Sequence, residues 1–180
     1  MLNITVPSIR LWNPETEEFT YTSPVSLQLE HSLISLAKWE ARWHKPFLTS
    51  KQKTPEELLD YIRCMTLTQN VDPDLYKKLP PDVIDKIVFY MNEEQHATTF
   101  GNTSNERPSR EVVTAEIIYY WMVTFGIPFE CQKWHLSRLM ALVKVCSIKN
   151  SPQKKMTARE IQTRNRALND ARRKSMHTRG

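Results

Sequence analysis

The chain contains very little glycine. Three of its 180 residues are glycine, Gly101, Gly126 and Gly180, and they stand far apart. The phosphate-binding loops of Rossmann and P-loop enzymes need several glycines within about ten residues, so this spacing excludes both nucleotide-binding folds. Eleven prolines accompany the three glycines. The composition predicts helices with firm breaks and argues against a β-sandwich or barrel with many tight turns.

Cysteine is also scarce. Cys64, Cys131 and Cys146 are odd in number, and each lies within an apolar helical pattern. A disulfide framework uses an even, larger set of cysteines in a secreted chain. We therefore expect three reduced thiols in the core of a cytosolic protein.

No long uninterrupted hydrophobic run is present. The most apolar stretch, residues 112–129, contains Glu116 and is broken by Gly126 and Pro128. A membrane span needs about 20 consecutive apolar residues, so this stretch predicts a buried helix and no membrane partner. The first twelve residues lack a basic segment followed by an apolar run, so we expect no signal peptide.

The residue patterns for catalysis and metal binding are weak. Cys131 and His135 are four residues apart, but a structural zinc site needs four nitrogen or sulfur ligands, and no second pair accompanies them. Glu116 stands in a largely apolar helix, where a salt bridge or a position at the edge of the core explains it. We therefore expect no metal, no cofactor and no catalytic residues, in a protein that is not an enzyme.

Three consecutive aromatic residues, Tyr119, Tyr120 and Trp121, are candidates for a platform that stacks nucleic-acid bases. Such platforms carry basic residues between the rings. These three residues lie in the least charged part of the chain instead. We interpret them as core residues of a central helix.

Positive charge is concentrated at the C-terminus. Residues 149–180 hold ten Lys/Arg and two acids, a net charge of +8, whereas the whole chain is only +5 and residues 1–148 are therefore −3. We divide the chain into a body, residues 1–148, and a flexible, helical basic tail, residues 149–180. Such asymmetry indicates an acidic partner, either nucleic acid or protein. The candidate partner-binding residues of the basic tail are Lys154, Lys155, Arg159, Arg164, Arg166, Arg172, Arg173 and Lys174.

The body is predicted to be mainly α-helical. Residues 4–22 alternate in polarity and predict a small N-terminal β-hairpin, and residues 26–43 have apolar residues at helical spacing. A further helix is predicted over residues 54–70, with Thr54 as its cap and Glu57 returning the capping hydrogen bond. The remaining pattern predicts an exposed loop over residues 92–109 and helices over residues 80–91, 109–125, 129–146 and, in the basic tail, 157–174.

Two segments give the chain a family resemblance. They are EIIYYWMVTFGIPFECQKWHLSRLMALVKVC, from Glu116 to Cys146, and RNRALNDARRKSMHTRG, from Arg164 to Gly180. The likeness continues upstream through residues 29–48 and 61–73. In these segments the chain resembles the tail assembly chaperones of long-tailed, siphovirus-like bacteriophages.

The resemblance implies a non-enzymatic protein of the infected host's cytoplasm. Tail assembly chaperones bind the long, helical, aggregation-prone tape-measure protein and keep it in solution. They help to recruit the major tail protein, leave as the tail tube polymerises, and are absent from the virion. The family often has a second, longer form made by a translational frameshift.

Two alternatives stay open. A small nucleic-acid-binding protein would use the basic tail as a phosphate-contacting arm. A structural head–tail component would be retained in the virion. The sequence does not set the oligomeric state.

Overall fold

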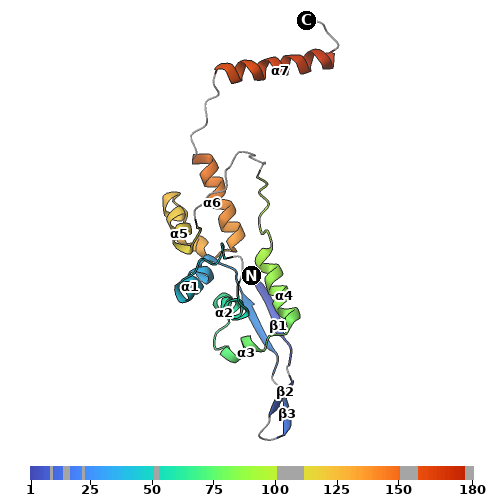
Figure 1. Ribbon diagram of the computed structural model, residues 1–180, viewed down its shortest axis with the longest axis vertical. Helices are drawn as coiled ribbons and strands as arrows, with labels where there is room; N and C mark the ends of the chain where they lie inside the picture. The colour runs from blue at the N-terminus through green and yellow to red at the C-terminus, as the bar shows by residue number, and fades with distance from the viewer. Residues whose placement is uncertain are drawn as a thin grey trace. The chain divides into compact units, whose positions relative to one another are not determined.

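The computed structural model describes residues 1–8, 10–13, 17–21, 23–50, 53–100, 112–150 and 158–176. Over these residues the chain is mainly helical, with a small antiparallel sheet at the N-terminus, which confirms the predicted fold class (Figure 1). The chain separates into two compact units, Met1–Ser147 and Ile148–Gly180, and each is described by itself. The flexibility of the basic tail stays a prediction.

The N-terminal hairpin is longer than predicted. Its strands pair as β1 with β4 and β2 with β3, and their bounds are Leu2–Val6 (β1), Arg10–Asn13 (β2), Glu18–Tyr21 (β3) and Val25–Leu29 (β4). Both pairs continue a single register, which places Pro7 opposite Pro24 between them. Because proline has no N–H to donate, the ladder is interrupted there. The described strands therefore form two two-stranded antiparallel sheets, β1 with β4 and β2 with β3, whose pairings share one register.

The prediction of a helix from residue 26 is wrong for residues 26–32. Leu27 and Leu29 are fully buried in β4, where alternate residues face the core. Leu29, four residues before Leu33, also continues the helical spacing of α1 (Leu33–Trp43), so the sequence pattern at this residue fits both periods. α1 begins only after Ser32, whose hydroxyl caps its first turn.

The predicted helix start at Thr54 is confirmed. At the start of α2 (Pro55–Met65) the Thr54 hydroxyl accepts the Glu57 N–H at 3.2 Å, and Glu57 Oε2 accepts the Thr54 N–H at 2.9 Å. α2 ends earlier than predicted because the next residues pair with β4, where the Leu67 N–H donates to the Gln28 carbonyl oxygen at 2.8 Å. α4 (Pro81–Asn92) follows as predicted, and a short unpredicted helix, α3 (Pro73–Lys77), precedes it.

The last helices of the body differ from the prediction at their starts. α5 (Ala115–Thr124) begins six residues after Ser109, the predicted cap, which lies outside the described residues. The predicted helix over 129–146 is instead a 3-10 helix, η1 (Phe129–Lys133), followed by α6 (Leu136–Asn150). The chain is extended between them because the Leu136 N–H donates to the His31 carbonyl oxygen at 2.7 Å. A tertiary contact thus divides the predicted helix.

The predicted loop over residues 92–109 is described only as far as residue 100. Residues 93–100 have no regular structure, but they are not fully exposed. The Gln95 N–H donates to the Ser137 hydroxyl at 3.1 Å, and the Lys144 ammonium lies 4.6 Å from the centre of the Phe100 ring. This part of the loop therefore contacts α6.

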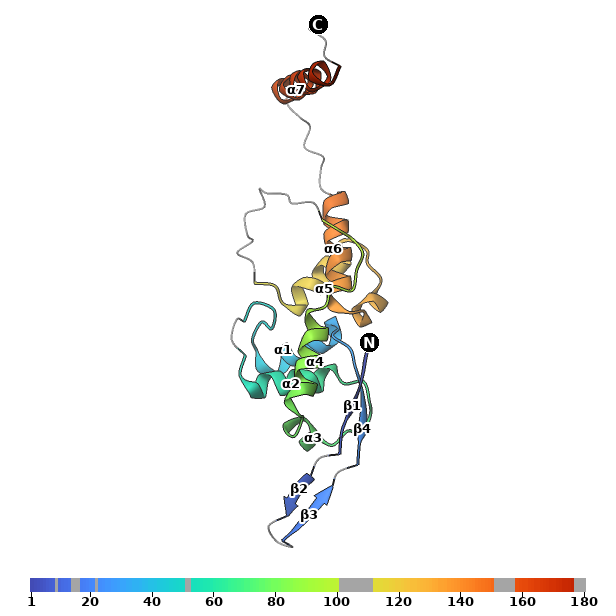
Figure 2. The ribbon, with the colours of Figure 1, turned by 90° about the vertical axis from the view of Figure 1, so that its right-hand side faces the viewer.

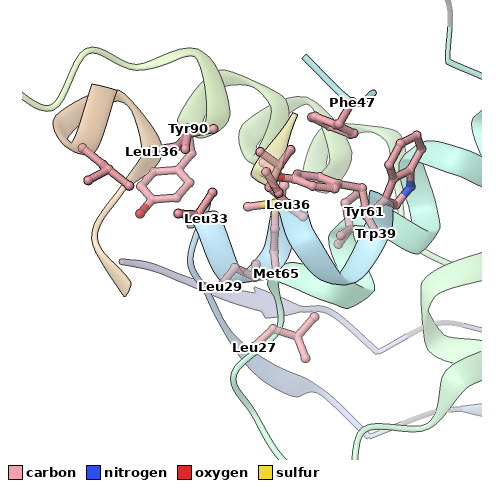
Figure 3. Packing of buried hydrophobic residues seen from close by; sticks show 14 of the residues in the cluster. Leu27, Leu29, Leu33, Leu36, Trp39, Phe47, Tyr61, Met65, Tyr90 and Leu136 are labelled. Atoms are coloured by element: carbon pink, nitrogen blue, oxygen red, sulfur yellow. The ribbon is translucent and has the colours of Figure 1, made fainter. Parts of the chain in front are cut away.

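The core gathers around α1 (Figure 3). The rings of Phe47 and Tyr61 stack with their centres 3.7 Å apart, and Trp39 meets both rings edge-on. The Trp39 indole N–H donates to the Glu57 carbonyl oxygen at 2.9 Å, so the buried polar atom of the ring is satisfied. Within the part of the chain that the structure describes, no helix combines the length and apolarity needed to cross a bilayer.

Candidate functional site

The predicted basic residues lie largely on one helix. α7 (Ala158–Met176) carries Arg159, Arg164, Arg166, Arg172, Arg173 and Lys174, all exposed. Lys154 and Lys155, which the sequence also singles out, lie outside the described residues. The structure therefore brings six of the eight predicted residues onto a single exposed element.

Three of the five arginines of α7 lie along one side of the helix. Arg159, Arg166 and Arg173 are seven residues apart, and seven residues make almost two full helical turns, so they form one line along the helix. Ile161 and Leu168 form a second, apolar line on the opposite side, and both are exposed. Within its own unit, α7 thus presents a cationic line and an unpacked apolar line.

A second candidate surface lies on the body, where the prediction for the aromatic triplet is wrong for Tyr120. Tyr119 and Trp121 are partly buried and pack against the core, whereas Tyr120 is 64% exposed. Val123 is 64% and Phe129 55% exposed, and the Tyr119 and Phe129 rings lie 6.4 Å apart. We call Tyr119, Tyr120, Val123 and Phe129 the α5 patch.

The α5 patch is exposed because the core uses only one side of α5. Ala115, Ile118 and Met122, at spacings of three and four, are the buried residues of this helix. The helix is apolar on most sides, and that pattern predicts full burial. Apolar residues left outside the core in this way are typical of protein-binding surfaces.

A buried carboxylate fixes the start of α5. Glu40 of α1 is only 7% exposed, and its Oε2 accepts the Ala115 N–H at 2.7 Å. Its Oε1 accepts the Phe47 N–H at 2.8 Å. Glu40 therefore caps α5 from a distant part of the chain and holds the α5 patch in place. Glu40 is not among the residues predicted from the sequence, and Glu116, the acid that the sequence singles out, is exposed to solvent.

Cys131 and His135 lie on different elements. Cys131 lies in η1, and His135 lies in the extended link before α6. Among the described residues, no group of three or more His, Cys, Asp or Glu side chains could hold a metal ion. The three cysteines are free thiols, and burial raises the pKa of Cys64.

His135 belongs instead to a buried polar cluster. The His31 and His135 rings lie 5.2 Å apart, and His31 Nδ1 is 2.7 Å from the Tyr61 hydroxyl. His135 Nδ1 is 2.8 Å from the Ser137 hydroxyl, and its Nε2 is 3.2 Å from the Tyr90 carbonyl oxygen. Burial and the neighbouring His135 lower the pKa of His31 from 6.5 to about 3. Burial also lowers the pKa of His135, so both rings are neutral near pH 7, which suits a structural role.

Comparisons of the chain with family models, with curated proteins and with solved structures give no match. Two surfaces of the molecule are candidates for a functional site: the α5 patch on the body and the cationic line of α7 in the basic tail.

Proposed function

We propose that this protein is a tail assembly chaperone of the kind made by long-tailed bacteriophages. It is not an enzyme, acts in the host cytoplasm, binds the tape-measure protein, helps to recruit the major tail protein and is not retained in the virion. The segments that resemble this family, residues 116–146 and 164–180, include the α5 patch and two of the three arginines of the cationic line, Arg166 and Arg173.

The α5 patch is the observation that best supports this proposal. A chaperone of a long helical client has to cover the apolar stripe of an amphipathic helix, and an exposed apolar surface does this. Tyr120, Val123 and Phe129 provide such a surface. Glu40 and the buried face of α5 hold it rigidly, so little conformational entropy is lost when a client binds.

The basic tail supports release as well as binding. Arg159, Arg166 and Arg173 are exposed on one side of α7, where an acidic surface can contact all three. Contacts between exposed charges form quickly and weaken with salt. Such a contact suits a factor that is displaced when the tail tube polymerises.

Polar substitutions in the α5 patch should weaken client binding. We expect the double variant Tyr120→Ser/Val123→Ser to bind the tape-measure protein about tenfold more weakly, since exposed aromatic anchors dominate such interfaces. The measurement is the fraction of co-expressed tape-measure protein that stays in the supernatant. Leu67→Ser, at a residue 53% exposed outside the patch, is the matched control. Equal client solubility with the double variant and with the wild type would contradict this role.

Nucleic-acid binding is the second candidate function. The line of Arg159, Arg166 and Arg173 favours it, because phosphate groups would be contacted by the same side chains. If this is the function, the basic tail binds nucleic acid, and the double variant Tyr120→Ser/Val123→Ser should bind nucleic acid as tightly as the wild type does. A structural head–tail component is the third possibility. Mass spectrometry of purified virions distinguishes it from a chaperone, because only a structural component should be present in the virion in quantity.

A further inference from the structure

One edge of the N-terminal sheet is open among the described residues. β4 has partners on both sides: β1 on one, and residues 65–67 on the other, through hydrogen bonds such as Glu30 N–H to the Met65 carbonyl oxygen at 3.0 Å. β1 pairs only with β4 in the part of the chain that the structure describes. Its outer edge therefore has unpaired backbone N–H and C=O groups, which are a template for another strand.

A groove runs between this edge and α4. α4 lies beside β1 in both views of the molecule (Figures 1 and 2). The groove has a volume of about 740 Å³, and Leu2, Ile4, Asp85, Phe89 and Glu93 are among the residues that line it. Phe89 is 74% exposed, so an aromatic ring stands in solvent at this wall. The groove therefore combines an open strand edge with an apolar surface.

The helix side of the groove carries uncompensated negative charge. Among the described residues no cation lies within ion-pair distance of Asp85 or Glu93. Lys86, which also lines the groove, is 3.7 Å from Asp82 and is already paired. An occupant that complements these walls has to be both apolar and basic.

The spacing of the groove residues defines the occupant further. Asp85 and Phe89 lie in α4, and Glu93 is the residue that caps its C-terminal end. The three are four residues apart along the chain, so about 6 Å of helix axis separates each from the next. In an extended strand, alternate side chains on one face are about 6.6 Å apart. Three alternate residues of a strand therefore match the three groove residues, with a basic residue at each acid and an apolar residue at Phe89.

We propose that the groove between β1 and α4 binds an extended segment of a partner protein with the pattern basic–x–apolar–x–basic, added to β1 as a further strand. Main-chain hydrogen bonds to β1 provide affinity, and the contacts with Asp85, Phe89 and Glu93 provide selectivity. The inference does not depend on the proposed function, because the α5 patch and the groove lie on different elements. It gives the body a second contact, for an extended rather than a helical segment.

Fluorescence anisotropy with the purified full-length chain tests the proposal. The probe is a labelled peptide, Thr-Lys-Thr-Phe-Thr-Lys-Thr, and any affinity tag is placed at the C-terminus because β1 begins at Leu2. We expect saturable binding that weakens about tenfold with Phe89→Ser, and by a similar factor with the charge-reversed variant Asp85→Lys/Glu93→Lys. The charge-reversed variant should in turn prefer a peptide with glutamate in place of both lysines. All three groove residues are at the surface, so circular dichroism should show unchanged folding.

Backbone N-methylation tests the added strand itself. Alternate N–H groups of a strand point to opposite sides, so methyl groups on one alternate set block pairing with β1 and those on the other set do not. One of the two N-methylated peptides should lose binding and the other should keep it. Equal binding of both peptides would overturn strand addition. Absence of binding by the lysine peptide, or no exchange of preference in the charge-reversed variant, would overturn the whole inference, and an intact interaction with the tape-measure protein would then leave the proposed function standing.

Discussion

Replacement of Glu40 by alanine is expected to lower the free energy of unfolding by about 3–5 kcal/mol, since each of two buried N–H groups left without an acceptor costs about 1–3 kcal/mol. The two groups are the backbone N–H of Phe47 and that of Ala115, and both residues are buried. The loss also frees the start of α5, so the α5 patch should lose its fixed position. Urea unfolding followed by circular dichroism measures the effect.

Two variants show whether the effect comes from the buried hydrogen bonds. Glu40→Gln keeps the size of the side chain but places an amide NH₂ against one of the two N–H donors, so it should also be clearly destabilising. Glu116→Ala removes an exposed acid from α5 itself and should change stability by less than about 0.5 kcal/mol. Equal stability of the Glu40 and Glu116 variants would show that Glu40 does not hold α5.

Acidification is expected to destabilise the body through its buried histidines. The pKa of His31 is lowered to about 3 in the fold, first by burial and then by His135, and burial also lowers the pKa of His135. The unfolded chain takes up protons near pH 6.5, the ordinary value, while the folded chain does not. The contribution of these histidines to the free energy of unfolding is therefore complete above pH 6.5 and is lost as the pH falls from 6.5 toward 3. At pH 5, His31 alone should cost about 2 kcal/mol relative to pH 8.

The histidine contribution is isolated by comparing pH profiles of urea unfolding. His31→Gln should remove about 2 kcal/mol from the difference between pH 8 and pH 5, whatever its stability at pH 8. Tyr61→Phe removes the hydroxyl that contacts His31 Nδ1 but keeps both imidazole rings. It should therefore lower stability at every pH and leave the pH dependence unchanged. If the free energy of unfolding of His31→Gln falls between pH 8 and pH 5 by as much as that of the wild type, His31 is not the source of the acid sensitivity.

Helix starts that depend on residues a few positions apart are predicted correctly from the sequence. Thr54 and Glu57 are three residues apart and form the predicted capping box, so the start of α2 is correct. α4 is correct for a similar reason, because Pro81 stands at its first position and its apolar residues have a clear helical spacing. The predicted fold class follows from many such local patterns.

The errors arise where a distant contact decides between two local possibilities. Leu29 fits both the spacing of a strand and that of a helix, and pairing of β4 with β1 and with residues 65–67 selects the strand. The contact between Leu136 and His31 likewise divides the predicted helix over residues 129–146. Neither contact has a sequence signal near the residues that it changes.

The two candidate surfaces also differ in whether neighbouring residues or distant contacts determine them. The positive charge of the basic tail is evident from its composition. Because charged side chains stay in solvent, the exposure of the basic residues of α7 follows from the same composition. The α5 patch could not be predicted, because an apolar helix gives no sign of which side the core will use. Glu40 stands among the buried residues of α1, beside Leu36 and Trp39, and that is its one local signal, but its role depends on Ala115, 75 residues away.

A pull-down from cells that express the tape-measure protein and the major tail protein tests the central claim most directly. It compares the full-length chain with a truncation at Asn150, each with and without nuclease. We expect both forms to recover the tape-measure protein, with or without nuclease, because the α5 patch lies in the body. Recovery of nucleic acid alone, lost on truncation, would contradict the chaperone function and establish the basic tail as a nucleic-acid-binding arm.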